Sequence, residues 1–272
     1  MEIYDYLIIA ILGSFGAFLS GLLGVGGGII FIPVLDHFLK KCGMHDDMLV
    51  KGILANSLFT IIFSGSVSSY KQYKMGNFFP KQIWQTALPG VFTAILLTYL
   101  IKSGNWYNKG TFNYVFAGML LVIMIRMFLK GKTTPGTWPE PTARQFGTTG
   151  FFTGIITALS GLGGGVVMTP VFTDVLKIPI KKASSISNGV IPLFAIAIGI
   201  YNLGDTPPYK ISEWQVGYIV FPVILPMILA AFIFAPLGVK IAQQTTQSII
   251  RLIFAMMVGL VLIKVLYEIF AK

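Results

Sequence analysis

The chain has 272 residues, of which 55% are hydrophobic and only 11% are charged, and it carries a formal charge of +10. Soluble domains contain about 25% charged residues, so this composition excludes an ordinary soluble protein. In a soluble chain an excess of basic residues indicates nucleic-acid binding. Here the charges lie between long apolar runs, so we expect no nucleic-acid partner. The composition predicts an all-α polytopic membrane protein surrounded by the lipid bilayer.

The first half of the chain begins with two apolar segments that a run of glycines separates. Gly26, Gly27 and Gly28 form the run, and Pro33 follows within the second segment. Glycine weakens helices, and bare backbone survives at membrane depth only when it is buried in protein or faces a cavity. One helix through both segments would be about 50 Å long, too long for a hydrocarbon core of about 30 Å. The run therefore predicts a helical hairpin, either as two crossings or as one re-entrant pair. With three further segments, the apolar stretches of this half cover residues 6–24, 29–39, 52–69, 83–101 and 112–128.

The same pattern returns in the second half of the chain. Gly163, Gly164 and Gly165 are followed by Pro170, within a set of apolar segments at 146–162, 166–175, 183–203, 215–237 and 248–267. The stretch between the halves is rich in Pro, Gly and Thr and is too polar to span a membrane. We expect an N-terminal transmembrane repeat at 1–130, a cytoplasmic linker at 131–145 and a C-terminal transmembrane repeat at 146–272. The second motif is shorter than the first between its serine and its glycine run, so equivalent roles for the two copies do not follow.

The topology follows from the hairpin and from the charges. With a glycine-broken hairpin and three further transmembrane helices, each half crosses the bilayer an odd number of times, which predicts inverted-topology repeats. In that arrangement acids and bases balance on the side of the two termini, and the whole excess of +10 falls on the side of the linker. Cytoplasmic loops carry the lysine and arginine excess. We therefore expect both termini outside and the linker inside.

The duplicated glycine run is a candidate binding site. The first N–H groups of a helix lack partners and carry the positive end of the helix dipole, and glycine lets an anion approach them closely. Nearby serine and asparagine side chains would add donors. The alternative is that the small residues only allow close helix packing. The predicted substrate-binding residues are Ser20, Gly26, Gly27, Gly28, Asn56, Ser57, Ser160, Gly163, Gly164, Gly165, Ser187 and Asn188, with Pro33 and Pro170 as hinge or structural residues.

Other constellations are weaker. Asp36 and Asp174 follow the two prolines and are candidates for a gate or proton relay, although interfacial residues at segment ends are the plainer interpretation. His37 and His45 do not supply the three ordered ligands that a metal site needs, so we expect no metal. The spans contain no histidine except His37, near the end of the 29–39 stretch, and no pair of central aspartates, so we expect no catalytic residue, no cofactor and no enzyme.

The first motif, Ser-Gly-Leu-Leu-Gly-Val-Gly-Gly-Gly with Pro-Val-Leu after it, resembles that of the sulfite exporter TauE/SafE family, also called toluene sulfonate uptake permeases. The resemblance covers nearly the whole chain, and the second motif departs from the pattern by its shorter spacing. It implies transport of sulfite, organosulfonates, sulfoacetate or related anions across a bacterial inner membrane. The family's motif residues carry over to Gly26, Gly27, Gly28, Pro33, Gly163, Gly164, Gly165 and Pro170.

We therefore expect a secondary transporter of small sulfur-containing anions, bound near the midplane and moved by alternating access as one repeat bundle rocks. Export is favoured because moving a monovalent anion out of a negative interior gains about 2.3 kcal/mol per 100 mV. The alternatives are proton- or sodium-coupled uptake of organic anions and a non-transporting membrane scaffold. The expected partners are a small anion, the bilayer and, as one option, a second copy of the chain in a homodimer.

Overall fold

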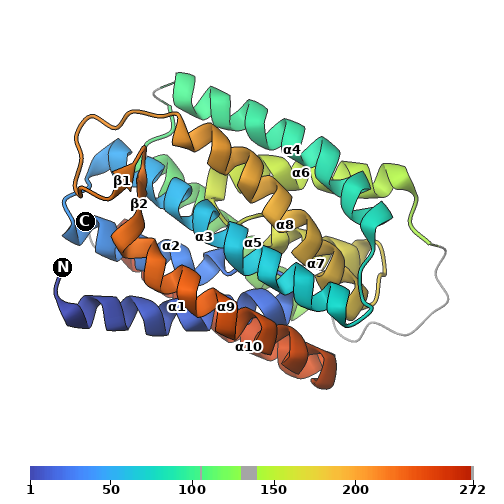
Figure 1. The fold of residues 1–272 in the computed structure, drawn as a ribbon. Helices are drawn as coiled ribbons and strands as arrows, with labels where there is room; N and C mark the ends of the chain where they lie inside the picture. The colour runs from blue at the N-terminus through green and yellow to red at the C-terminus, as the bar shows by residue number, and fades with distance from the viewer. Residues whose placement is uncertain (105, 130–139, 271–272) are drawn as a thin grey trace.

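The computed structural model describes residues 1–104, 106–129 and 140–270, and these form a bundle of helices (Figure 1). A short loop or turn joins most consecutive helices, and the chain passes back and forth along the bundle. The elements in order are α1 (Ile3–Leu23), α2 (Gly28–Lys41), α3 (Asp46–Lys74), α4 (Pro80–Ser103), α5 (Lys109–Leu129), α6 (Ala143–Ser160), α7 (Gly165–Pro170), the π-helical turn η1 (Val171–Val175), α8 (Ile180–Leu203), β1 (Gln215–Val216), β2 (Ile219–Val220), α9 (Phe221–Gln244) and α10 (Gln247–Phe270).

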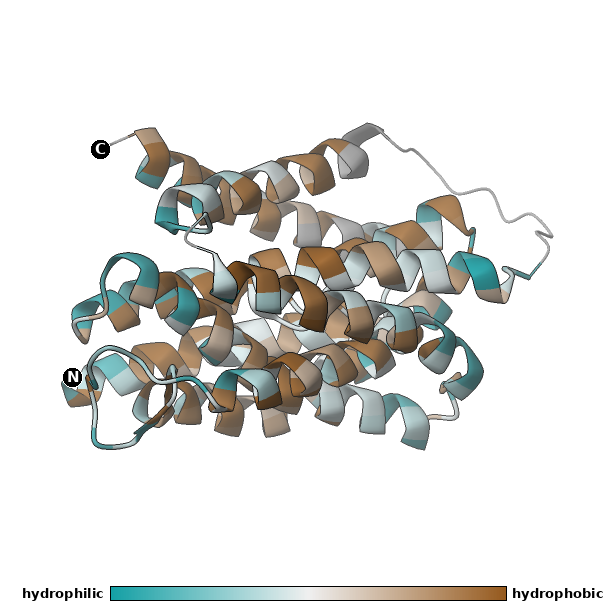
Figure 2. Ribbon diagram, turned by 90° about the horizontal axis from the view of Figure 1, so that it is seen from above, coloured by the Kyte–Doolittle hydropathy of each residue, from teal (hydrophilic) through white to brown (hydrophobic). Residues whose placement is uncertain are grey.

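Apolar residues dominate the helices, and polar residues gather toward the ends of the bundle (Figure 2). By length and composition, 5 helices of the described chain can cross a membrane, namely α1, α3, α4, α8 and α9. Shorter apolar stretches lie at Lys109–Ile125 and Gly165–Val175. The prediction of an all-α membrane protein is confirmed. Residues 131–139 of the predicted linker lie outside the described residues.

Two predicted segments have a different local structure. The segment at 215–237 begins as a β-hairpin, in which Gln215 pairs with Val220, and α9 starts only at Phe221. Gly217 supports the turn with a φ of 58°, and a proline in the first turn of α9 has no N–H that must find a partner. The segment at 166–175 is a six-residue helix, which ends at Pro170, followed by η1. There the N–H of Leu176 donates to the carbonyl of Val171 at 3.0 Å, a π-type spacing.

The helix pairings connect the two halves of the chain. α1 packs along α9, α6 packs along α4, and α3 packs along α8. Exchanging each helix with the one at the same place in the other half (α1 with α6, α4 with α9, α3 with α8) leaves this set of pairs unchanged. Two repeats packed face to face require this pattern. The inverted membrane topology and the repeat boundaries stay predictions.

Glycines let the first helix of each hairpin pack tightly against its partner from the other half. A Cβ on Gly238 of α9 would lie 2.8 Å from the backbone nitrogen of Leu22 in α1. A Cβ on Gly154 of α6 would lie 2.8 Å from the carbonyl carbon of Gly90 in α4. Membrane helices approach closely where small residues face each other. Close backbone contact therefore holds α1 against α9 and α6 against α4, in each case a helix of the opposite half.

The two ends of the bundle are distinct. Asp5 pairs with Lys41 at 2.7 Å and Lys102 pairs with Asp205 at 2.6 Å, which places the start of α1 with the ends of α2, α4 and α8. We call this end the termini side, because the N and C marks of Figure 1 lie there. α6 begins at the opposite end, where Lys182 lies 3.4 Å from Glu140. We call that end the connector side.

Candidate functional site

The two glycine runs adopt the same backbone conformation. Gly27 precedes α2 with a φ of 79°, and Gly164 precedes α7 with a φ of 78°. This left-handed conformation is costly for any residue with a Cβ. At both places the chain reverses, so that the second arm of each hairpin runs back beside the first. The predicted helical hairpins are present, and we call their turns the first tip (24–28) and the second tip (161–165).

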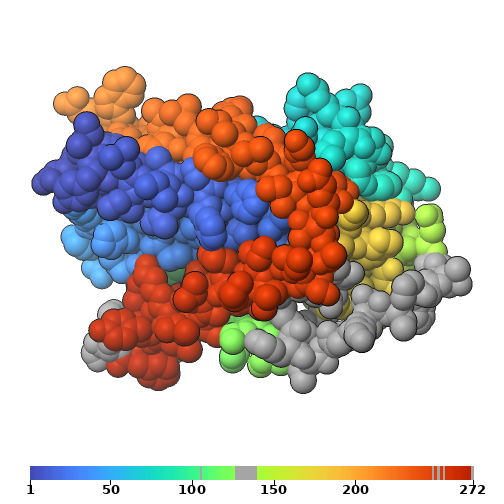
Figure 3. All heavy atoms as spheres, turned by 90° about the horizontal axis from the view of Figure 1, so that it is seen from below, coloured from blue at the N-terminus to red at the C-terminus, as the bar shows by residue number. Residues whose placement is uncertain are grey.

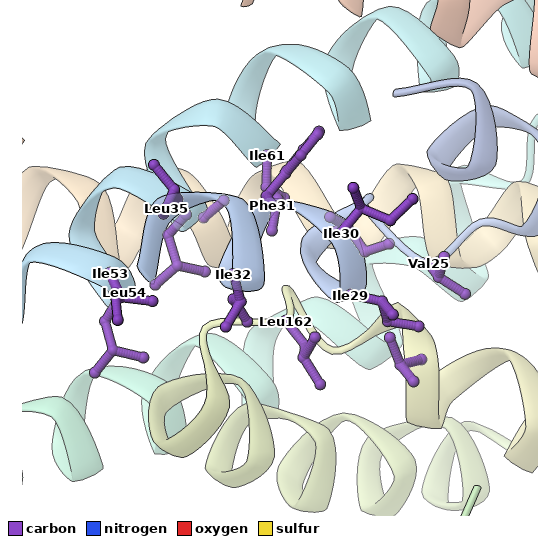
Figure 4. Packing of buried hydrophobic residues seen from close by; sticks show 14 of the residues in the cluster. Val25, Ile29, Ile30, Phe31, Ile32, Leu35, Ile53, Leu54, Ile61 and Leu162 are labelled. Atoms are coloured by element: carbon purple, nitrogen blue, oxygen red, sulfur yellow. The ribbon is translucent and has the colours of Figure 1, made fainter. Parts of the chain in front are cut away.

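The two tips touch each other inside the bundle. A Cβ on Gly28 would lie 2.8 Å from the Cα of Leu162, and a Cβ on Gly165 would lie 2.8 Å from the Cα of Val25. Figure 4 shows Leu162 of the second tip close to Ile29 and Ile32 of α2. Every residue of both tips is buried. The structure thus brings together the two glycine runs that are far apart in sequence.

Both tips present backbone donors. In the described chain, the N–H groups of residues 26–29 make no hydrogen bond. The regular helix bonds begin with Ile30 and Phe31, whose N–H groups donate to the carbonyl of Gly27. The second tip is alike: residues 163–166 donate none, and Val167 and Met168 donate to Gly164. The helices behind them differ, because α2 has 14 residues and α7 has 6. Only α2 is long enough to develop the dipole that favours an anion at its start.

Hydroxyl groups from the neighbouring helices hold the tips in place. The Oγ of Ser57 in α3 donates to the carbonyl of Gly161 at 2.9 Å, and the Oγ of Ser64 donates to the carbonyl of Gly26 at 3.1 Å. Thr169 donates to the carbonyl of Gly24 at 3.2 Å and contacts the Oγ of Ser187 at 3.1 Å. The predicted binding residues Ser57 and Ser187 therefore already bind protein groups.

The two serines of the motifs differ. Ser160 donates to the carbonyl of Ile156 at 2.7 Å and accepts from the N–H of Leu162 at 3.3 Å. Ser20 is fully buried, and its Oγ has no hydrogen-bond partner within the described chain. Of this pair, only Ser20 keeps its hydrogen-bonding capacity free.

The two asparagines differ more. Asn56 donates to the carbonyls of Gly52 at 2.8 Å and Tyr218 at 2.7 Å, and it accepts from the N–H of Val220 at 2.8 Å. It therefore fastens the β1–β2 hairpin to α3. Asn188 is equally buried, yet neither atom of its amide has a partner within the described residues. The roles predicted for these residues in substrate binding stay predictions.

Several buried polar residues near the tips were not predicted. On α3, Ser64, Ser68 and Gln72 continue from Ser57 at helical spacing, and all are fully buried. Ser184 precedes Asn188 by one turn of α8. A Cβ on Gly24 would lie 2.8 Å from the Oγ of Ser184, so Ser184 borders the first tip. The signal was present in the sequence, because small polar residues recur on one face of an otherwise apolar helix.

The two prolines lie differently behind the tips. Pro33 is inside α2, where its carbonyl accepts a hydrogen bond of 3.0 Å from the Nζ of Lys264 in α10. Pro170 is the last residue of α7. Close to Pro33, a cavity of about 450 Å³ lies between α1, α2 and α10. Figure 3 shows the surface of α10 (red) beside that of α1 and α2 (blue). The hinge role of both prolines stays a prediction.

The two aspartates lie at opposite ends of the bundle and away from the tips. Asp36 is 4% exposed, and it pairs with Lys40 at 2.7 Å and with Lys109 at the start of α5. Beside it, a cavity of about 300 Å³ is lined in part by Lys40, Lys109 and Glu268. Asp174 is also buried and lies in η1, where it accepts a hydrogen bond of 3.4 Å from Thr173. A gate or relay role for either stays a prediction.

The comparisons with known proteins agree with this architecture. A family model described as "Sulfite exporter TauE/SafE" matches residues 9–265. A probable membrane transporter protein of Methanocaldococcus jannaschii is 27% identical over 257 residues, which cover 93% of this chain and 92% of the relative. One of Haemophilus influenzae is 24% identical over 259 residues (92% and 94%), and the probable membrane transporter protein YunE of Bacillus subtilis is 22% identical over 285 residues (97% and 98%). The resemblance found in the first motif is confirmed, and the chain belongs to the sulfite exporter TauE/SafE family of multi-pass membrane proteins.

Proposed function

We propose that this protein is a secondary transporter that exports small sulfur-containing anions, such as sulfite, organosulfonates or sulfoacetate. The observation that carries the proposal is the meeting of the two glycine tips, where the N–H groups of residues 26–29 and 163–166 make no hydrogen bond in the described chain. An anion needs donors, and these tips offer donors at the centre of the bundle. The family description points to the same class of substrate.

The chemistry of the tips favours an oxyanion that binds weakly enough to leave again. The main donors are backbone N–H groups at the start of α2. Two further donors without a partner are the buried hydroxyl of Ser20, just before the first tip, and the amide of Asn188 on α8. Of the lysines whose ion pairs the structure describes, those paired with Asp36, Asp205 and Glu140 lie toward the ends of the bundle, and Lys264 binds the carbonyl of Pro33 within α2. Conduction requires binding that permits both entry and release, and a site of neutral donors meets this requirement better than a buried lysine.

The direction of transport follows from charge. Export of a monovalent anion from a negative interior gains about 2.3 kcal/mol per 100 mV, so export needs no coupling ion, whereas uptake would. We place the connector side in the cytoplasm and both termini outside, because the basic excess of the sequence falls on the connector side. Alternating access about the two tips is the expected mechanism.

Flux into reconstituted vesicles tests the proposal. Purified protein is reconstituted, and uptake of labelled sulfite, taurine, sulfoacetate and sulfate is measured with and without a proton gradient. We expect flux of sulfite or a sulfonate that an imposed potential drives without protons. Flux that requires a proton or sodium gradient would instead support coupled uptake. No anion-dependent flux from well-folded protein would contradict transport and favour a scaffold.

Cysteine labelling tests the orientation. Asp47 on the termini side and Glu140 on the connector side are both exposed, and Asp47→Cys and Glu140→Cys are made in a Cys42→Ser background. In whole cells an impermeant maleimide should modify position 47 and spare position 140. The reverse result would overturn the orientation. Replacing Cys42 removes a thiol whose pKa burial raises, and which therefore reacts slowly in any case.

A further inference from the structure

Four buried polar residues lie on the neighbouring helices α3 and α8, toward the connector side. They are Ser68 and Gln72 of α3 and Ser184 and Asn188 of α8, and we call them the connector-side seam. Their relative exposures are 0%, 0%, 4% and 0%. The Oγ of Ser68, the Nε2 of Gln72, the Oγ of Ser184 and both amide atoms of Asn188 have no hydrogen-bond partner within the described chain.

The packing of the two helices places these residues together. A Cβ on Gly65 of α3 would lie 3.1 Å from the Cδ of Pro192, and a Cβ on Gly199 of α8 would lie 3.2 Å from the Cδ1 of Ile62. The helices are therefore antiparallel, and moving along α3 from Gly65 toward its end corresponds to moving along α8 toward its start. One and two turns beyond Gly65, Ser68 and Gln72 of α3 come to the same levels along the bundle as Asn188 and Ser184 of α8.

The outer end of the seam is fixed by hydrogen bonds. Asn77, in the loop after α3, donates to the Oε1 of Gln72 at 2.9 Å and to the carbonyl of Lys181 at 3.2 Å. Its own carbonyl accepts from Ser185. The first tip borders the seam at Ser184, where a Cβ on Gly24 would lie 2.8 Å from the Oγ of Ser184. The seam thus extends from the first tip to the loops of the connector side.

The same interface is closed and apolar on the termini side. There Ile62, Ala195 and Ile198 belong to the apolar core, and the buried side chains of Asn56, Ser57 and Thr60 on α3 all bind protein groups. A buried polar atom without a partner destabilises a protein, and almost all such atoms in folded proteins have one. Several together on one side of a transport site point to a ligand.

We propose that the connector-side seam is the cytoplasmic part of the permeation path, in which a small sulfonate or sulfite anion and its water bind to Ser68, Gln72, Ser184 and Asn188. This inference rests on the proposed function. The unpaired groups are hydroxyls and amides, which donate to an oxyanion without the strong attraction of a fixed charge. An anion leaving the cytoplasm would meet the seam first and then the N–H groups of the first tip.

Thiol accessibility tests the seam. Ser68→Cys and Ser184→Cys change little in volume and are made in a Cys42→Ser background. Both should react with an anionic sulfonatoethyl methanethiosulfonate applied to the connector side, and sulfoacetate should slow the reaction at least tenfold. Sulfite is unsuitable as the protecting anion, because it cleaves the disulfide product. The matched control is Thr60→Cys, since Thr60 is also on α3 and fully buried, but its hydroxyl donates to Asn56 at 2.8 Å. Equal reaction at position 60, or none at 68 and 184, would overturn the inference.

Removal of the polar atoms provides a second readout. Asn188→Leu and Ser68→Ala keep a similar or smaller volume, and deleting unpaired polar atoms should leave the melting temperature unchanged or higher. We expect each variant to lose at least tenfold in sulfite or sulfonate flux. Unchanged flux in variants of raised stability would make the seam a packing feature and overturn the inference. The proposed function would still stand in that case, because the wild-type protein transports the anion. Absence of wild-type flux, with the seam thiols still labelled and protected, would contradict the function alone.

Discussion

The two glycine hairpins share a turn and differ in the helix behind it. Both tips are entered through a glycine in the same left-handed conformation, with a φ of 79° at Gly27 and 78° at Gly164. Behind the first tip is a continuous helix of 14 residues, whereas behind the second are a helix of 6 residues and a π-helical turn. The two hairpins thus share the turn, which close packing requires, and differ in the helix, on which the strength of an anion site depends.

The difference has a correlate in sequence. Asp36 follows Pro33 by three residues, whereas Asp174 follows Pro170 by four. The π-helical turn at Val171–Val175 accommodates the additional residue. The first hairpin is also tied to α5 and α10, through Lys109 and Lys264. We therefore regard the first hairpin as the better anion site, and four predictions test this comparison.

The largest effect is expected at the first tip. Gly27→Ala places a Cβ in the left-handed region and 2.7 Å from the carbonyl oxygen of Gly16. The conformation costs about 1–2 kcal/mol and overpacking about 1–3 kcal/mol more. Thermal unfolding in detergent should show a loss of about 2–5 kcal/mol. The control is Gly76→Ala, where φ is 71° and a Cβ would meet nothing within 4 Å, so only the conformational cost should appear. Equal losses at both positions would show that tip packing is unimportant.

The next effect concerns the ion pairs of the first hairpin. Asp36→Asn leaves Lys109 without its buried partner, and removing one member of a buried pair costs about 3–5 kcal/mol. Unfolding measured against denaturant should report this loss, with α5 less protected from hydrogen exchange. Glu140→Gln is the comparison, because its carboxylate is 84% exposed and its pair with Lys182 should contribute less than about 1 kcal/mol. If Asp36→Asn left the stability unchanged, the first hairpin would not depend on its ion pair with α5.

A smaller effect separates the two asparagines. Asn56→Ala removes three hydrogen bonds and leaves backbone groups of Tyr218 and Val220 unpaired, which should cost about 2–4 kcal/mol. Asn188→Ala removes none that the described structure contains, so its cost should be limited to the lost volume. Melting temperatures of the two variants measure the difference. Equal destabilisation would show that Asn188 has partners comparable to those of Asn56.

The smallest effect separates the two tips themselves. Ser64→Ala removes the hydroxyl bond to Gly26 of the first tip, and Ser57→Ala removes that to Gly161 of the second. Each should cost about 1 kcal/mol in stability. If the first tip is the better anion site, the flux of Ser64→Ala should fall further than that of Ser57→Ala. A larger loss for Ser57→Ala would reverse the ranking of the hairpins.

The sequence was informative where chain chemistry alone decides the structure. Apolar runs of the length of a bilayer predicted the helices, and the repeated glycine run predicted the chain reversals at both tips. The prediction was wrong for the first residues of the segment 215–237, because a short apolar run is compatible with either a strand or a helix. The hydrogen-bond partners of those residues decide between the two. Those partners are each other and Asn56, which lies far away in sequence.

The candidate site was predicted only in outline. Glycines in a run are easy to recognise, because few positions require a left-handed backbone. Serines are not, because in a membrane helix a hydroxyl usually bonds to its own backbone, as that of Thr60 does. Whether Ser68 or Ser184 lacks such a bond depends on the neighbouring helix. The sequence pattern therefore located the tips and missed the seam that leads to them.

The glycine contacts between α1 and α9 and between α4 and α6 have a mechanical consequence. Because backbone contacts backbone at these glycines, we expect the two helices of each pair to move together. We therefore expect the moving bodies to be pairs that take one helix from each half, in place of the single rocking repeat bundle that we expected from the sequence. Crosslinking α1 to α9 should leave the working cycle intact, whereas a staple from α1 to α4 would join two bodies and stop it.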